Sequence, residues 1–192
     1  RRELKFALEK YWAGKSSEGE LLEAVAALRT AAWARQKALG VDWLPSNDFS
    51  LYDHVLDTSI MLGAVPERYG VGDGEASLDT YFAMARGTSG AGDGCGHGQG
   101  HTAQEMTKWF DTNYHFMVPE LAAGQRLSLN SSKVVGEYRE AKAQGFETRP
   151  VLLGPVTWLK LAKGREVDPL EFLDQVLGLY AVVLGQLKHA GA

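Results

Sequence analysis

The chain has 192 residues, which is enough for one sizeable core and short for two. Hydrophobic residues make up 45% and charged residues 23% of it, so a disordered, collagen-like or disulfide-rich chain is excluded. A formal net charge of −4 gives no bulk attraction for nucleic acid. The single cysteine, Cys95, excludes an internal disulfide and fits a reducing compartment. Because no run of about 18 apolar residues occurs, we expect a cytoplasmic protein that binds neither nucleic acid nor membrane.

Helical spacing of apolar residues dominates the chain. The first predicted helix carries Leu4, Leu8 and Tyr11 at i, i+4 and i+7. Ser17 and Glu20 form a capping box at the start of the second, which we expect to stop at Gly40. In chain order, helices are predicted over residues 2–13, 17–40, 51–62, 78–86, 133–144, 157–161 and 169–187, with helical or mixed structure at 105–110.

Short apolar or alternating runs between these helices predict strands. The runs are residues 41–45, 114–121, 126–129 and 150–155. The last of them has the pattern of a strand buried on both faces. Because strands that alternate with long helical connections run parallel and are covered by helices, the predicted fold class is α/β. About three or four strands are too few to close an eight-stranded barrel.

Residues 87–102 form a segment in which seven of sixteen residues are glycine. Such a segment cannot bury enough apolar surface to offset the entropy of ordering it, so we predict a flexible surface loop. Cys95, His97 and His101 have the side chains of zinc ligands in the spacing C-x-H-x3-H. Zinc needs four organised ligands on a rigid frame, which favours the interpretation that the loop carries these residues without binding metal.

Two polar clusters are candidate binding surfaces. Arg2 and Lys5 share a helix face at i, i+3 and suit a carboxylate or phosphate, although a solvated helix end has the same pattern. Residues 105–115 (EMTKWFDTNYH) combine Lys108 and Asn113 with several aromatic side chains. Core packing and a binding surface both account for this second cluster.

A third cluster, residues 49–57, places carboxylates and an imidazole near a predicted strand-to-helix junction, where sites collect in parallel α/β folds. The alternative is helix capping by Asp48 or Ser50, with Asp53 and Asp57 as surface acids. The sequence contains no G-x-S-x-G, P-loop or H-E-x-x-H motif. Its chemistry is therefore not indicated by a short catalytic motif.

Five segments in order give the chain a resemblance to a known family. They are RRELKFALEKYW, DFSLYDHVLDTSIMLGAVPERY, LDTYFAMARG, EMTKWFDTNYHFMVPEL and RPVLLGPVTWLKLAK. Together they resemble the N-terminal half of cobalamin-independent methionine synthase. The resemblance implies an enzyme of two (βα)8 barrels that makes methionine by methyl transfer from 5-methyltetrahydrofolate polyglutamate to homocysteine. Residues 1–192 would then be part of the N-terminal, TIM-like barrel, which binds the folate tail.

The same resemblance implies which residues of this chain contact the substrate. The RELK motif matches Arg2–Lys5, the lysine of EMTKWF matches Lys108, and the asparagine of DTNYH matches Asn113. The implied binding positions for 5-methyltetrahydropteroyltriglutamate are Arg2, Glu3, Leu4, Lys5, Lys108 and Asn113. The catalytic zinc and its Cys and His ligands belong to the C-terminal barrel, so the resemblance implies no catalytic residue and no metal or cofactor in this chain.

The chain departs from the family at both ends and in the glycine-rich segment. It lacks the strand expected before the RELK helix and stops before the next one, so we expect a fragment that is inactive alone. Residues 87–102 look longer than the family needs, as a tolerated insertion would. Two alternatives remain open: a non-catalytic binding or regulatory module on the barrel scaffold, and a protein that binds metal through the 87–102 loop.

Overall fold

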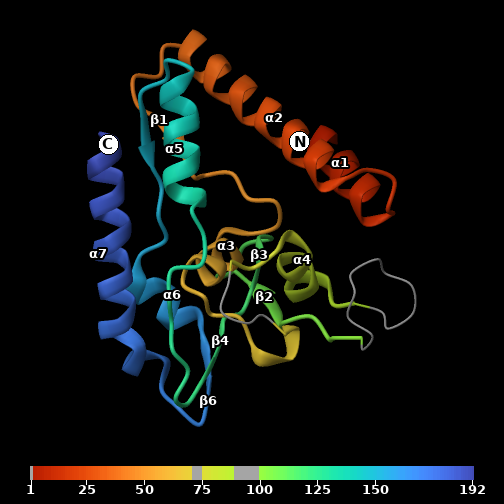
Figure 1. The fold of residues 1–192 in the computed structure, drawn as a ribbon, viewed down its shortest axis with the longest axis vertical. Coiled ribbons are helices and arrows are strands. Elements are labelled where there is room, and N and C mark those ends of the chain that lie inside the picture. Colours follow the sequence, from red (N-terminus) through yellow and green to blue (C-terminus); the bar gives the residue numbers. More distant parts are fainter. Residues whose placement is uncertain (1, 71–74, 89–99) are drawn as a thin grey trace.

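Helices carry most of the secondary structure, which a computed structural model describes over residues 2–70, 75–88 and 100–192 (Figure 1). Two of the elements, η1 and η2, are short 3₁₀ helices. The helices are α1 (Arg2–Trp12), α2 (Glu18–Ala38), α3 (His54–Met61), η1 (Glu67–Tyr69), α4 (Leu78–Arg86), α5 (Lys133–Ala143), α6 (Pro155–Leu161), η2 (Pro169–Phe172) and α7 (Leu173–Ala190).

The strands are short and form three separate pairs within the described residues. They are β1 (Leu44–Ser46), β2 (Met106–Lys108), β3 (His115–Met117), β4 (Glu120–Ala122), β5 (Thr148–Pro150) and β6 (Lys163–Arg165). β1 pairs with β5 and β4 pairs with β6, both in parallel, whereas β2 and β3 form an antiparallel hairpin. The α/β class with few parallel strands is therefore confirmed.

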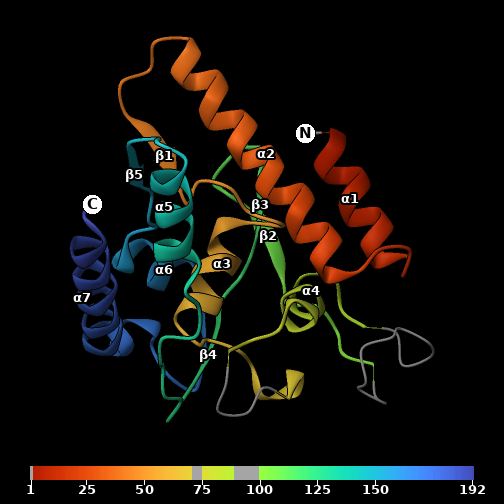
Figure 2. The ribbon, with the colours of Figure 1, turned by 45° about the horizontal axis from the view of Figure 1, so that its top comes forward.

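Two apolar clusters meet at β3. Phe116 and Val118 pack in the cluster that includes Trp158 of α6 and the inner face of α7. Met117, which points to the other side of the strand, packs in the cluster formed with Leu56 of α3 and with residues of α1, α2 and α4. Figure 2 shows α1 and α2 side by side above α3 and α4. β3 thus lies between the two halves of the core.

The predicted helices are confirmed, with several boundaries moved. For example, α3 begins at His54 rather than at residue 51, because Asp53 caps it, and α7 extends to Ala190 rather than residue 187. Three other predictions were wrong. Residues 106–108 form a strand, since they pair with β3, and residues 126–129 form no strand. The strand expected at 150–155 ends at Pro150, and it is not buried on both faces, because Val151 is 48% exposed. The glycine-rich segment lies largely outside the described residues, including Cys95 and His97.

Within the described residues, one helical segment, Pro169–Ala190, is long and apolar enough by length and composition to cross a membrane. Counting uninterrupted apolar residues does not detect it, because polar residues such as Gln175 interrupt the run. In this molecule Val176, Tyr180 and Val183 lie on its buried face, against the core that contains Trp158.

The capping box of α2 gives a direct test of local stability. The Ser17 hydroxyl accepts a hydrogen bond from the Glu20 amide at 3.2 Å, and the Glu20 carboxylate accepts one from the Ser17 amide at 2.8 Å. We expect Ser17→Ala to lower the free energy of unfolding by about 1 kcal/mol, measured by chemical denaturation. The matched control is Ser16→Ala, and an equal loss in both variants would contradict the capping role.

Candidate functional site

A cavity of about 610 Å³ opens where the parallel strands β1 and β5 end. The segments after both strands contribute to its lining, together with one face of α3 and the start of α5. Leu4 of α1 and Tyr114 of the β2–β3 hairpin complete it. The lining residues are Leu4, Asn47, Asp48, Phe49, Ser50, Tyr52, His54, Asp57, Thr58, Met61, Tyr114, Ser131, Lys133, Val134, Val151 and Leu153. Ligands collect at this edge of parallel α/β sheets, so we take this cavity as the candidate site.

Asp53 fixes α3 beside the cavity. One oxygen of its buried carboxyl, Oδ1, accepts hydrogen bonds from the amides of Val55 at 2.7 Å and Leu56 at 3.0 Å, which caps the helix. The other oxygen accepts one from the amide of Met117 on β3 at 3.1 Å. Burial raises the pKa of Asp53 to about 6, although the three donated hydrogen bonds act in the opposite direction. The side chain therefore ties α3 to β3.

Asp57 and Lys133 form a polar floor under the cavity. Asp57 accepts hydrogen bonds from Ser50 at 2.7 Å and Tyr81 at 2.8 Å, and its carboxylate lies 3.3 Å from the Lys133 ammonium. The same ammonium donates to Asn47 at 2.8 Å and lies 3.2 Å from the Glu137 carboxylate. Since Lys133 has three such partners and three N–H groups, it is not a free cation for a ligand.

Asn47 joins the ends of the two parallel strands. It has a left-handed backbone with φ of 57°, which asparagine tolerates better than most residues. Its amide N–H donates to Glu137 at 3.1 Å, and its side-chain NH₂ donates to the carbonyl oxygen of Val151 at 2.7 Å. Burial raises the pKa of Glu137, and the nearby positive charge of Lys133 offsets part of this rise. This network connects the ends of β1 and β5 to α5 at the edge of the cavity.

An aromatic group forms one wall of the site. The His54 ring stacks on Tyr114 with a centroid separation of 5.4 Å and lies 5.2 Å from the ring of Trp109. His54 Nδ1 and the Tyr114 hydroxyl are 2.9 Å apart. Burial lowers the pKa of His54 and raises the pKa of Tyr114 to about 12, so the pair is neutral at pH 7. With Tyr114 donating to Nδ1, the Nε2–H of His54 is the hydrogen-bonding group left for a ligand.

Of the six residues expected from the family motifs, the lining of this cavity includes one. Leu4 is part of the lining, whereas Arg2, Glu3 and Lys5 are not. The Lys5 side chain is 68% exposed and 3.7 Å from Glu9, which is a weak helical ion pair. Both Arg2 and Lys5 are exposed on the first turns of α1.

The hairpin places Lys108 and Asn113 outside the cavity too. Lys108 is exposed at the end of β2, opposite His115. Asn113 is exposed, and its backbone carbonyl lies 3.1 Å from Nδ1 of His115. The hairpin reaches the cavity through the next residue, Tyr114. The structure therefore groups Leu4 with Tyr114 in the lining, while Lys5 of α1 and Lys108 and Asn113 of the hairpin are exposed.

Sequence reasoning identified residues 49–57 but misjudged the acids in them. The α3 cap is Asp53 rather than Asp48 or Ser50. Asp53 and Asp57 are not surface acids, because the side chain of Asp57 is only 13% exposed and that of Asp53 is buried. Lys133 was missed entirely. Its spacing of four residues from Glu137 is a local signal, but its contact with Asp57 joins residues far apart in the sequence.

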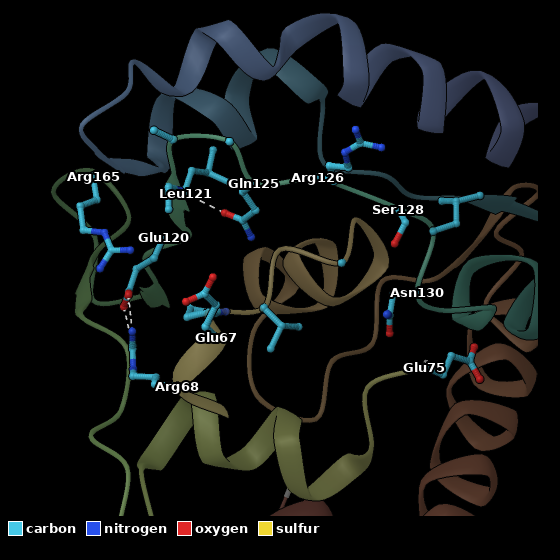
Figure 3. A pocket seen from close by; sticks show the side chains of 17 residues that line it. Glu67, Arg68, Glu75, Glu120, Leu121, Gln125, Arg126, Ser128, Asn130 and Arg165 are labelled. Atoms are coloured by element: carbon cyan, nitrogen blue, oxygen red, sulfur yellow. Dashed lines mark hydrogen bonds and ion pairs between the residues drawn. The ribbon is translucent and has the colours of Figure 1, made fainter. Parts of the chain in front are cut away.

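A larger cavity of about 1150 Å³ lies between η1 and the ends of β4 and β6 (Figure 3). Its acidic and basic lining residues balance: Glu67, Glu75, Glu120, Arg68, Arg126 and Arg165. Arg68 donates two hydrogen bonds to Glu120, at 2.6 and 2.7 Å, and Glu75 accepts one from the amide of Ser132 at 3.1 Å. None of the six substrate-binding positions implied by the family motifs, from Arg2 to Lys5 with Lys108 and Asn113, lines this cavity, so we do not take it as the site.

The described part of the chain holds no group of three or more His, Cys, Asp or Glu side chains placed to bind a metal ion. Of the three candidate loop ligands, Cys95 and His97 lie outside that part. His101 lies within it, with its ring 5.9 Å from that of Tyr69. The described residues thus offer no ligand set for the zinc that the resemblance places in another barrel.

Comparison with known proteins gives a match over the whole chain. The model of the family described as "Cobalamin-independent synthase, N-terminal domain" matches residues 1–192. A 5-methyltetrahydropteroyltriglutamate–homocysteine methyltransferase of Nitrobacter winogradskyi is 60% identical over 203 residues, covering 100% of this chain. Proteins of the same name from Rhodopseudomonas palustris and Salinibacter ruber are 60% and 53% identical. The chain spans about a quarter of their length, 26% for the Nitrobacter protein.

The raised pKa of Asp53 predicts a pH dependence of stability. The folded state holds the proton more tightly than the unfolded chain, whose ordinary value is 3.8. Asp53 therefore adds about 3 kcal/mol to the free energy of unfolding below pH 3.8. This contribution is lost as the pH rises through about 6. Denaturation of the natural polypeptide that carries these residues, between pH 4 and pH 7, measures it. Asp53→Asn is expected to remove this pH-dependent part, and a ¹³C titration of Asp53 with a midpoint near 3.8 would contradict the assignment.

Proposed function

We propose that this chain is the tail-binding part of a methionine-forming methyltransferase. The reason is that the chain belongs to the family of cobalamin-independent synthase N-terminal domains. The full activity would transfer a methyl group from 5-methyltetrahydropteroyltriglutamate to homocysteine. The observation that carries this proposal is the 60% identity to such methyltransferases across the entire chain. The chain would bind and orient the folate and would not catalyse the reaction alone.

The exposed cations around the cavity support binding of a polyanionic tail. Arg2 and Lys5 share one face of α1, and Lys108 ends β2 on the exposed side of the hairpin. A triglutamate tail carries several carboxylates, which lysine and arginine bind through charge-assisted hydrogen bonds. Among the described residues, Lys5 has one long ion pair, with Glu9, which a ligand carboxylate can replace at little cost.

Glu3, Leu4 and Asn113 complete the proposed tail site in different ways. Leu4 connects the cationic turn of α1 to the cavity lining. Asn113 offers a side-chain amide that both donates and accepts hydrogen bonds. Glu3 lies between Arg2 and Leu4, where it limits the net positive charge of the turn.

The proposal includes the wider architecture. The two parallel strand pairs and their covering helices would be part of a (βα)8 barrel, packed beside a second barrel of the same cytoplasmic polypeptide. Zinc bound in that second barrel would supply a homocysteine thiolate by lowering the thiol pKa. The residues of this chain would hold the tail so that the methyl-bearing end reaches the other barrel.

Charge changes at the tail site give the kinetic test. In the natural polypeptide that carries these residues, we expect Lys108→Ala to raise the KM for the triglutamyl folate about fivefold, and Lys5→Glu about tenfold, because each removes about 1 kcal/mol or more of binding. The KM for homocysteine stays unchanged. Steady-state kinetics with each substrate varied in turn measures both constants.

Lys15→Glu is the matched control, because Lys15 is an exposed lysine beyond the end of α1. It is expected to leave both constants unchanged. Equal KM values for the folate in wild type, Lys108→Ala and Lys5→Glu would contradict the tail site.

A further inference from the structure

The candidate cavity has the lining of a site for a flat aromatic group. Four ring side chains, those of Phe49, Tyr52, His54 and Tyr114, contribute to it. Apolar side chains, among them Leu4 and Val151, contribute to the remaining wall beside polar ones. A cavity of about 610 Å³ with this composition is of the size and kind that encloses small ring-containing ligands.

The polar groups of the cavity do not favour a charged ligand inside it. The Lys133 ammonium is saturated by Asn47, Asp57 and Glu137. A carboxylate entering the cavity would meet Asp57 without a free cation to compensate it. The Nε2–H of His54 and the hydroxyls of Tyr52 and Ser131 are neutral donors among the described lining residues, which suits a carbonyl oxygen next to a ring.

The surroundings of the cavity have the opposite character. Leu4 and Tyr114 line it, and their sequence neighbours Lys5 and Asn113 are exposed outside. A ligand that satisfies both regions has an uncharged ring at one end and carboxylates that extend away from it. The RELK helix and the β2–β3 hairpin thus each supply one residue of the cavity lining and, next to it in the sequence, one exposed polar residue.

We propose that this cavity binds the p-aminobenzoyl ring of the folate, with its carbonyl toward His54 Nε2 and its glutamates toward Lys5 and Lys108. This inference rests on the proposed function, because that function supplies a ligand with a ring joined to glutamates. It adds that the ring itself is held by this domain, against Tyr114 and Val151.

The test compares two probes that differ only in the ring: γ-linked triglutamate and p-aminobenzoyl-γ-triglutamate. Isothermal titration calorimetry on the natural polypeptide that carries these residues gives both dissociation constants. We expect the ring to strengthen binding about tenfold, from burial of its apolar surface and stacking. Val151→Trp fills the cavity from a half-exposed position and is expected to abolish that advantage while leaving triglutamate affinity unchanged.

Two matched controls accompany the measurement. Val156→Trp changes an equally exposed valine, 52% exposed on α6 and outside the cavity lining, and should keep the tenfold advantage. His54→Ala should reduce the advantage several-fold, whereas His189→Ala, at the end of α7, should not. Circular dichroism establishes that each variant is folded.

The outcomes separate the two proposals. Equal affinity of wild type for both probes, or an equal loss for both probes in Val151→Trp, would overturn the ring site while leaving the tail site standing. Failure of wild type to bind either probe would overturn the proposed function, and the ring site with it. A ring advantage lost in Val151→Trp and His54→Ala and kept in both controls supports the inference.

Discussion

The buried carboxyl of Asp53 is the contact on which the candidate site depends. It caps α3 through the amides of Val55 and Leu56 and at the same time accepts the amide of Met117 on β3. The helix and the hairpin are thereby joined at the point where His54 meets Tyr114. Burial makes the ionised form of this carboxyl costly, as its raised pKa shows. The joint is therefore most stable with the carboxyl protonated.

The network of Asp57 and Lys133 and the aromatic group of His54, Tyr114 and Trp109 have different roles in the site. Asp57, Lys133 and Glu137 connect the end of β1, α3 and α5, and each N–H group of Lys133 has a partner. A network satisfied in this way holds its neighbours rigidly and offers little to a charged ligand. Ligand charges are consequently met outside, by the exposed cations of α1 and β2, and the cavity is left to an uncharged group.

Local signals in the sequence predicted the helices well and the strands poorly. Caps such as Ser17 with Glu20, and apolar spacing along α7, act within a few residues and are visible in the chain. Three-residue strands are defined by their partners, and some partners are distant, as when Leu44 of β1 pairs with Thr148 of β5. β2, expected to be helical or mixed, is defined by its hairpin with β3. The site residues were likewise predictable where the signal is local and not where distant segments meet. The RELK and EMTKWF motifs indicated exposed cations, whereas the contact between Asp57 and Lys133 joins elements that only the fold brings together.

The central claim is that one ligand places an uncharged ring in the cavity and its carboxylates on the cations outside. The most direct measurement is a crystal structure of the natural polypeptide that carries these residues, bound to p-aminobenzoyl-γ-triglutamate. The account predicts electron density for the ring against Tyr114 and Val151, with the glutamates extending toward Lys5 and Lys108. Density for the ring in the larger cavity beside Glu120, or a ring left in solvent, would contradict it.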